Sequence, residues 1–174
     1  MNNQQVTTTE LAYLAGLIDG EGCFSLRVVS SGKSSKWKRI LAGFEMCNTD
    51  PKLIFKCDEI VKKINVNMRI RKSHYASTKK EVWQIDTHRF VKVKRLIEYL
   101  LPYLIGKIER AELILKFINS RLERCKEGHN QWKHIPYTQE EIELATKVKM
   151  LNGRGTSETI REALATEQIL DVAG

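Results

Sequence analysis

The sequence predicts an α+β protein with an αββαββα core, in which helices cover one face of a four-stranded antiparallel sheet. Two pairs of short segments alternate apolar and polar residues, and longer segments around them carry apolar residues at helical spacing. The length of 174 residues suits a single domain of ordinary size. We expect its core at about 7–125 and a C-terminal helical extension at about 126–174.

The first predicted helix starts with the capping-box pattern of Thr7 and Glu10 and runs to about Ile18. Its core-facing stripe consists of Leu11, Leu14 and Ile18. A second stripe at helical spacing is almost without side chains and consists of Ala12, Ala15, Gly16 and Asp19. Such a face lets another helix backbone approach closely.

Two hairpins are predicted next, one from residues 24–29 and 37–47, the other from residues 68–71 and 82–85. Alternate apolar residues in both hairpins are expected to face the helices. These residues are Phe24, Leu26, Val28, Ile40, Ala42, Phe44, Met46, Met68, Ile70, Trp83 and Ile85.

The other helices are predicted from capping residues and from apolar spacing. Asp50 and Pro51 serve as cap and first-turn proline of the helix between the hairpins, and Thr138 with Glu141 forms a second capping box. Pro102 interrupts the helical spacing of the C-terminal half. We expect these helices at about 50–64, 87–101, 107–124, 138 onward and 156 onward.

The net charge of +8 is unevenly distributed. Between Arg27 and Arg95 there are 18 Lys and Arg against six Asp and Glu, which leaves the rest of the chain with a net charge of −4. A basic middle in a neutral-to-acidic frame is typical of a surface that binds a polyanion. The alternative is a charged surface that serves solubility. The basic residues lie mostly in strand-like segments, which disfavours a membrane-surface role.

Several protein classes are excluded or disfavoured. No apolar run is long enough to span a membrane, and the polar start predicts no export. We expect an intracellular protein, in the cytoplasm of a prokaryote or in a mitochondrion or chloroplast. The four cysteines form no C-x-x-C pair, so a disulfide framework is not expected. A zinc site at Cys125, His129 and His134 lacks a second ligand pair and is disfavoured against buried thiols and surface imidazoles.

The face of the predicted sheet that points away from the helices carries arginines and other polar groups. Arg and Gln can pair bidentately with guanine and adenine edges, and a two-stranded ribbon fits the major groove of DNA. The alternative is the ordinary wet face of a half-buried sheet. The candidate DNA-contacting residues are Ser25, Arg27, Val29, Lys33, Arg39, Leu41, Glu45, Arg69, Arg71 and Gln84.

Two acids, Asp19 and Glu21, stand where the first helix is predicted to end. A helix C-terminus carries partial negative charge, so acids there are disfavoured unless a cation is close. A bound Mg²⁺ would reverse that preference, because carboxylate and carbonyl oxygens are its preferred ligands. The alternative is that Asp19 folds back on the turn and Glu21 is solvated. These two residues alone do not decide between the two interpretations.

The segment that contains them is Leu14-Ala15-Gly16-Leu17-Ile18-Asp19-Gly20-Glu21-Gly22. It resembles the signature of the LAGLIDADG homing endonucleases at nine specific positions, and the predicted element order matches that family's core. The stretch Thr156–Arg161 looks like the C-terminal tail of the family's single-motif, homodimeric branch.

The resemblance implies site-specific hydrolysis of both strands of a long DNA site with Mg²⁺, for which Mn²⁺ or Ca²⁺ can substitute in binding. It implies that Glu21 binds the metal together with the Gly20 carbonyl, while Asp19 is mainly structural. By the same resemblance, Asn48 orders the attacking water, Lys52 lies near the scissile phosphate, and Lys107 supports the active site.

A single copy of the motif supplies one acid and one sheet, whereas cutting two strands needs two sites. We therefore expect a C2 homodimer that packs Ala12, Ala15, Gly16 and Asp19 against the same residues of its twin, on a roughly palindromic DNA site.

Two alternatives remain at this point. One is a non-cleaving nucleic-acid binder of the same fold, either an intron RNA maturase, with intron RNA as a further partner, or a transcriptional regulator. The other is a structural dimer whose basic sheet binds nothing specific.

Overall fold

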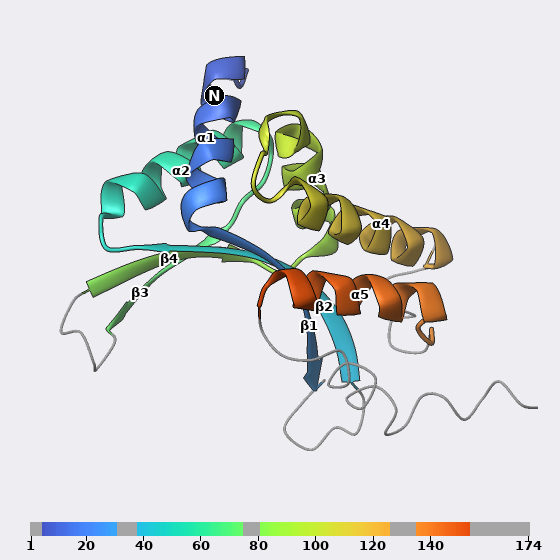
Figure 1. Ribbon diagram of the computed structural model, residues 1–174. Helices are drawn as coiled ribbons and strands as arrows, with labels where there is room; N and C mark the ends of the chain where they lie inside the picture. The colour runs from blue at the N-terminus through green and yellow to red at the C-terminus, as the bar shows by residue number, and fades with distance from the viewer. Residues whose placement is uncertain (1–4, 31–37, 75–80, 126–134, 154–174) are drawn as a thin grey trace, which may run out of the picture. The chain divides into compact units, whose positions relative to one another are not determined.

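The computed structural model describes residues 5–30, 38–74, 81–125 and 135–153 (Figure 1). The helices in this part of the chain are α1 (Thr8–Glu21), α2 (Pro51–Lys63), α3 (Phe90–Leu100), the short 3₁₀ helix η1 (Leu101–Tyr103), α4 (Ile108–Arg124) and α5 (Gln139–Leu151). The strands are β1 (Gly22–Ser30), β2 (Lys38–Asn48), β3 (Arg69–His74) and β4 (Glu81–Thr87). They form one four-stranded sheet in the order β1-β2-β4-β3.

The chain divides into two compact units. The first contains the residues up to Phe24 and the segment Gly43–Ala111, and the second contains Ser25–Ala42 and the residues from Glu112 onward.

The first unit packs α1, α2 and α3 over the β4 half of the sheet. β4 pairs antiparallel with both neighbours, so that Met46, Ile85 and Ile70 stand in one row across β2, β4 and β3. α2 contacts β4, and α1 contacts both α2 and α3; Figure 1 shows α1 and α2 on the same side of β3 and β4. The fully buried side chains between helices and strands include Leu14, Ile18, Phe24, Phe44, Ile54, Ile60, Ile85 and Leu96.

Helix α1 starts as its sequence dictates. The Thr7 hydroxyl accepts a hydrogen bond from the Glu10 backbone N–H at 3.2 Å, and the Glu10 carboxylate accepts one from the Thr7 N–H at 3.0 Å. The same carboxylate pairs with Lys63 of α2 at 2.5 Å. The Lys63 ammonium and the Thr7 N–H lower the pKa of Glu10 to about 2, which keeps this carboxylate ionised at neutral pH. Capping and ion pairing thus fix the start of α1 against α2.

The second unit combines the outer parts of β1 and β2 with most of α4 and with α5. Its buried residues include Leu26, Ile40 and Ala42 from the strands, Ile114, Phe117 and Ile118 from α4, and Ala145 and Val148 from α5. α5 begins with the predicted capping box, because the Thr138 hydroxyl accepts from the Glu141 N–H at 3.1 Å and the Glu141 carboxylate accepts from the Thr138 N–H at 3.0 Å.

The predicted fold class and element order are confirmed, and the element bounds differ by a few residues. α1 continues to Glu21 rather than to about Ile18, because it ends only where Gly22 turns the chain into β1. The predicted helix from Thr156 and the tail-like stretch 156–161 lie outside the described residues. Among the residues described, no helix is long and apolar enough to cross a membrane.

Candidate active site at the end of helix α1

Asp19, in the last turn of α1, holds the segment that leads into α4. Its carboxylate accepts hydrogen bonds from the backbone N–H groups of Ile105 at 2.8 Å, Gly106 at 3.2 Å and Lys107 at 3.0 Å. The Lys107 side chain in turn donates to the Asp19 backbone carbonyl. A carboxylate that accepts hydrogen bonds from three backbone N–H groups has a structural role. Asp19 therefore links α1 to the start of α4 and brings the Lys107 ammonium to the C-terminal end of α1.

Glu21 ends α1 and is exposed, as is Gly20 before it. The carbonyl of Ile18 accepts from the Gly22 N–H, and that of Asp19 accepts from Lys107, so Gly20 carries the next carbonyl at the helix end. Beyond its chain neighbours and the helix backbone, no atom of the described residues lies within 4 Å of a Cβ placed on Gly20, whereas a Cβ on Gly22 would lie 2.9 Å from the Ile18 carbonyl oxygen. The space beside Gly20 is open, and Gly22 is required for the tight passage into β1.

Electrostatics at this helix end favour a cation. The last turn of α1 contains no basic residue, and the helix dipole adds negative potential to the Glu21 carboxylate. Lys107, the residue before α4, supplies one positive charge.

The other predicted catalytic residues lie where β2 passes into α2. Asn48 is the last residue of β2, and its side-chain oxygen accepts from the Asp50 N–H at 2.8 Å. Asp50 caps α2 by accepting from the Lys52 N–H at 2.9 Å, and the Lys52 side chain is exposed in the first helical turn. β1 and β2 are neighbours in an antiparallel sheet, so the end of β2 lies beside the start of β1, directly after Glu21.

A divalent cation fits this donor set. Within the described residues there is no group of three or more His, Cys, Asp or Glu that could enclose a metal ion. Mg²⁺ rarely needs such a cage, because one or two carboxylates with waters and substrate phosphates complete its shell. An exposed carboxylate beside an open backbone carbonyl is the kind of open site that Mg²⁺ accepts.

On the β3–β4 part of the sheet, two of the predicted DNA-contacting arginines share one buried partner. The Asp86 carboxylate, 2% exposed, pairs with Arg69 at 3.0 Å and with Arg71 at 3.0 Å, and His88 lies 3.6 Å from it. The two arginine side chains remain 60% and 45% exposed. Asp86 thus fixes the inner ends of two guanidinium groups whose outer edges face solvent.

The strand register continues this polar face in rows. Glu45, Asp86 and Arg69 stand in one row across β2, β4 and β3, and Cys47, Gln84 and Arg71 stand in the next. Burial raises the pKa of the Cys47 thiol, which therefore stays protonated and neutral at physiological pH.

Residues 14–120 match the LAGLIDADG endonuclease family. The chain belongs to the LAGLIDADG endonuclease family. The matched residues begin at Leu14, so Asp19, Glu21 and Lys107 all lie within the matched part of the chain.

Solved LAGLIDADG structures share the fold. The homing endonuclease I-CvuI, in complex with an I-CreI target in the presence of Mg, is 22% identical with a TM-score of 0.65, over 90% of this chain and 93% of that one. The group I intron-encoded I-CeuI, complexed with DNA, is 14% identical with a TM-score of 0.64, over 92% and 78%. I-SmaMI bound to cleaved DNA is 18% identical with a TM-score of 0.62, over 93% and 49%. No curated protein matches the chain.

Two predicted site residues of this LAGLIDADG chain are placed differently from expectation. Ser25 was expected on the exposed face but is only 6% exposed, because β1 is covered on both faces at this point. Ala15 was expected on the exposed stripe of α1 but is fully buried with Leu14 and Ile18 in its own chain. The exposed stripe of α1 consists of Ala12 and Gly16, with Asp19 half-buried at its end.

The remaining predicted strand residues stay accessible. Arg39 is exposed, and Arg27, Val29, Leu41, Glu45 and Gln84 are half-buried. Lys33 lies outside the described residues, as do His129 and His134 of the disfavoured zinc site.

Asp86 is the site residue that sequence analysis missed. An acid in a basic segment does not stand out by composition, and the predicted alternation in this strand ends at Ile85. Continuing it by one residue places Asp86 on the face of Gln84. The pairing of Arg69 with Asp86 then follows from the hairpin register, which the sequence alone does not set.

Proposed function

We propose that this chain is a site-specific homing endonuclease that makes double-strand breaks in DNA by Mg²⁺-dependent phosphodiester hydrolysis. The observation that carries the proposal is the end of α1, where Glu21 is exposed while Asp19 holds Lys107 at the same helix end. Asp19 forms hydrogen bonds that hold the fold, whereas Glu21 is exposed and accessible to a metal ion.

In this proposal, Glu21 and the Gly20 carbonyl hold the metal ion. When bound, Mg²⁺ supplies charge stabilisation to the phosphate and lowers the pKa of a bound water. Mn²⁺ and Ca²⁺ prefer the same oxygen ligands and are expected to bind in its place.

The chain's own residues carry the other roles. Lys107, held by Asp19, places a positive charge where negative charge develops on the phosphate oxygens. Asn48, fixed by its hydrogen bond to the Asp50 N–H, offers its amide N–H₂ to orient the attacking water. Lys52, exposed in the first turn of α2, neutralises the neighbouring phosphate.

Recognition of DNA rests on the polar face of the sheet. Arg69 and Arg71 are exposed at their outer edges and fixed at their inner ends by Asp86, so each guanidinium is preorganised for a bidentate contact with guanine. Gln84 lies in the row of Arg71 and adds a side chain that suits adenine. The charge excess of the segment 27–95 attracts the DNA backbone without regard to sequence.

Replacing Asp86 with asparagine tests this arrangement. The variant frees both arginines from their shared carboxylate and adds one positive charge to the face. We expect affinity for unrelated DNA to rise and to fall more steeply with salt, while discrimination against single base changes weakens by about tenfold. Filter binding over a salt series measures both quantities.

Glu81→Gln is the matched control, because Glu81 lies on the same strand. Its carboxylate is half-exposed and pairs with Lys72. If Asp86→Asn and Glu81→Gln change base discrimination equally, the positioning of Arg69 and Arg71 by Asp86 is refuted.

The proposed enzyme is a homodimer on a roughly palindromic site. Each chain offers one Glu21, and two strands need two such acids. The exposed Ala12 and Gly16 let two α1 helices approach each other closely. The match to only 49% of I-SmaMI supports this view, because that longer chain has room for a second copy of the fold.

Replacing Gly16 with leucine is expected to separate dimerisation from folding. Apart from its chain neighbours and the helix backbone, no atom of the described residues lies within 4 Å of a Cβ placed on Gly16. Leucine also has the higher helix propensity by about 1 kcal/mol. The variant should therefore fold normally but sediment as a monomer. Analytical ultracentrifugation measures association, and circular dichroism measures folding.

Glu112→Leu places the same side chain on an exposed position of α4 and should remain dimeric. A dimeric Gly16→Leu variant, or a wild-type chain that cleaves DNA as a monomer, would refute the α1 interface.

A cleavage selection tests the function itself. The wild-type protein is incubated with Mg²⁺ and a randomised duplex library, and cut ends are sequenced. We expect recovery of one long, near-palindromic site cut on both strands. Binding that selects a sequence without any cleavage would instead support the non-cleaving maturase or regulator, and affinity that is undetectable or insensitive to salt would support a structural dimer.

A further inference from the structure

The outer part of β2 has an edge that β4 does not cover. β2 pairs with β4 from Phe44 to Asn48, and the strand continues outward to Lys38. At Ile40, which is only 2% exposed, the backbone N–H donates to the hydroxyl of Tyr137 at 2.7 Å. The hydroxyl of Tyr137, 97 residues further along the sequence, thus accepts a backbone hydrogen bond of the kind that a neighbouring strand accepts elsewhere along β2.

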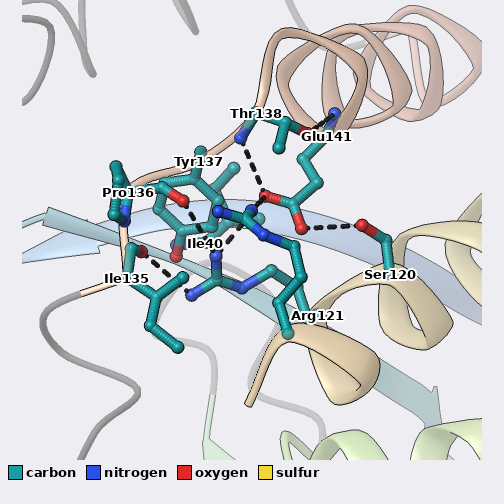
Figure 2. Close-up of polar contacts among 9 residues, drawn as sticks. Ile40, Ser120, Arg121, Ile135, Pro136, Tyr137, Thr138 and Glu141 are labelled. Atoms are coloured by element: carbon teal, nitrogen blue, oxygen red, sulfur yellow. Dashed lines mark hydrogen bonds and ion pairs between the residues drawn. The ribbon is translucent and has the colours of Figure 1, made fainter. Parts of the chain in front are cut away.

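The ring of Tyr137 contacts two side chains of α4. The Arg121 guanidinium lies 4.5 Å from the ring centroid, and the Phe117 ring stacks at 6.3 Å with an interplanar angle of 20°. Arg121 also donates to the carbonyls of Ile135 at 3.2 Å and Pro136 at 3.3 Å, so the chain before Tyr137 is fixed as well (Figure 2). The position of the hydroxyl is therefore set by α4.

Glu141 ties this arrangement to α5. Its fully buried carboxylate accepts from Ser120 at 2.9 Å, from Arg124 at 2.9 Å and from Arg121 at 3.4 Å (Figure 2). It also accepts from the Thr138 N–H at 3.0 Å. Three donors from α4 and the Thr138 N–H leave this side chain one arrangement, and residues 135–138, which include Tyr137, share that rigidity.

The strand residues on either side of Ile40 are candidates for DNA contact. Arg39 is exposed and Leu41 is half-buried, and side chains of neighbouring strand residues move with the backbone of Ile40. A bidentate base contact tolerates little displacement, because both hydrogen bonds need their full geometry.

We propose that Tyr137 is a positioning residue for DNA recognition, whose hydroxyl fixes the β2 backbone at Ile40 and thereby the placement of Arg39 and Leu41. The proposal rests on the proposed function. It differs from a purely structural role, which would lower stability and leave the preference for individual base pairs unchanged. Burial raises the pKa of Tyr137, so the hydroxyl stays neutral at physiological pH.

Tyr137→Phe tests the proposal, because it removes the hydroxyl and keeps the ring that contacts Arg121 and Phe117. The DNA site recovered by the wild-type protein is changed one base pair at a time, and relative cleavage is measured for each change. We expect discrimination to fall by about tenfold at one cluster of base pairs in each half-site and to stay unchanged elsewhere. Hydrogen exchange of residues 38–42 should become faster in the same variant.

Tyr99→Phe removes a hydroxyl from an exposed tyrosine of α3 and is the matched control. An unchanged base-pair profile for Tyr137→Phe, a uniform loss at all positions, or a variant that does not fold would each overturn the proposal. A wild-type protein that selects no DNA would instead refute the proposed function, so the two failures are distinguishable.

Discussion

Replacing Glu21 with glutamine should abolish DNA cleavage and leave DNA binding intact. Glutamine keeps the size of the side chain but loses the negative charge that holds the metal ion. Metal stabilisation of the developing charge is worth several kcal/mol, which corresponds to about 10³-fold or more in rate. Single-turnover cleavage of the selected site measures the rate, and a binding assay in Ca²⁺ measures affinity separately.

Glu112→Gln, an exposed position on α4, is the control and should cleave like the wild type. Because Glu21 is exposed and has no role in packing, both variants should unfold at the wild-type temperature. A Glu21→Gln protein that cuts at more than about a hundredth of the wild-type rate would contradict the assignment of this carboxylate.

The largest loss of stability is expected from Glu141→Gln in the second unit. The change leaves Arg121, which is 2% exposed, without its buried counter-charge, and it weakens the hydrogen bonds to Ser120, Arg124 and Thr138. Breaking a buried ion pair by removing one partner costs about 3–5 kcal/mol of unfolding free energy. Urea denaturation followed by circular dichroism measures this quantity.

The neighbouring Glu140→Gln is the matched control, since Glu140 is exposed in the same first turn of α5. It should change the unfolding free energy by less than about 0.5 kcal/mol. Equal effects of the two variants would show that the carbonyls of Ile135 and Pro136 satisfy Arg121 without Glu141.

Local signals explain why the element order could be predicted. The caps Thr7, Asp50 and Thr138 and the breaker Pro102 act within a few residues, and all four stand at element boundaries in the structure. The apolar alternation in the strands likewise depends only on neighbouring residues, and Ile40, Ala42, Phe44 and Met46 are buried as predicted.

The contacts that build the site act over long sequence distances and could not be predicted in this way. Asp19 binds amides 86 to 88 residues away, and Tyr137 binds an amide 97 residues away. Ser25 and Ala15 show the same limit, because helical and strand periodicity give the direction of a side chain but not what covers it. The motif resemblance is the basis for predicting Glu21, Gly20 and Lys107 as site residues, and the structure adds how Lys107 is held.

The three amides that Asp19 binds have a consequence for how such proteins diverge. A carboxylate reaches Ile105, Gly106 and Lys107 together only if the backbone between η1 and α4 keeps one length and one path. Insertions or deletions in this connection would separate Lys107 from α1, the helix that ends at Glu21. Length variation among related chains should therefore accumulate in the hairpin tips and avoid this short connection.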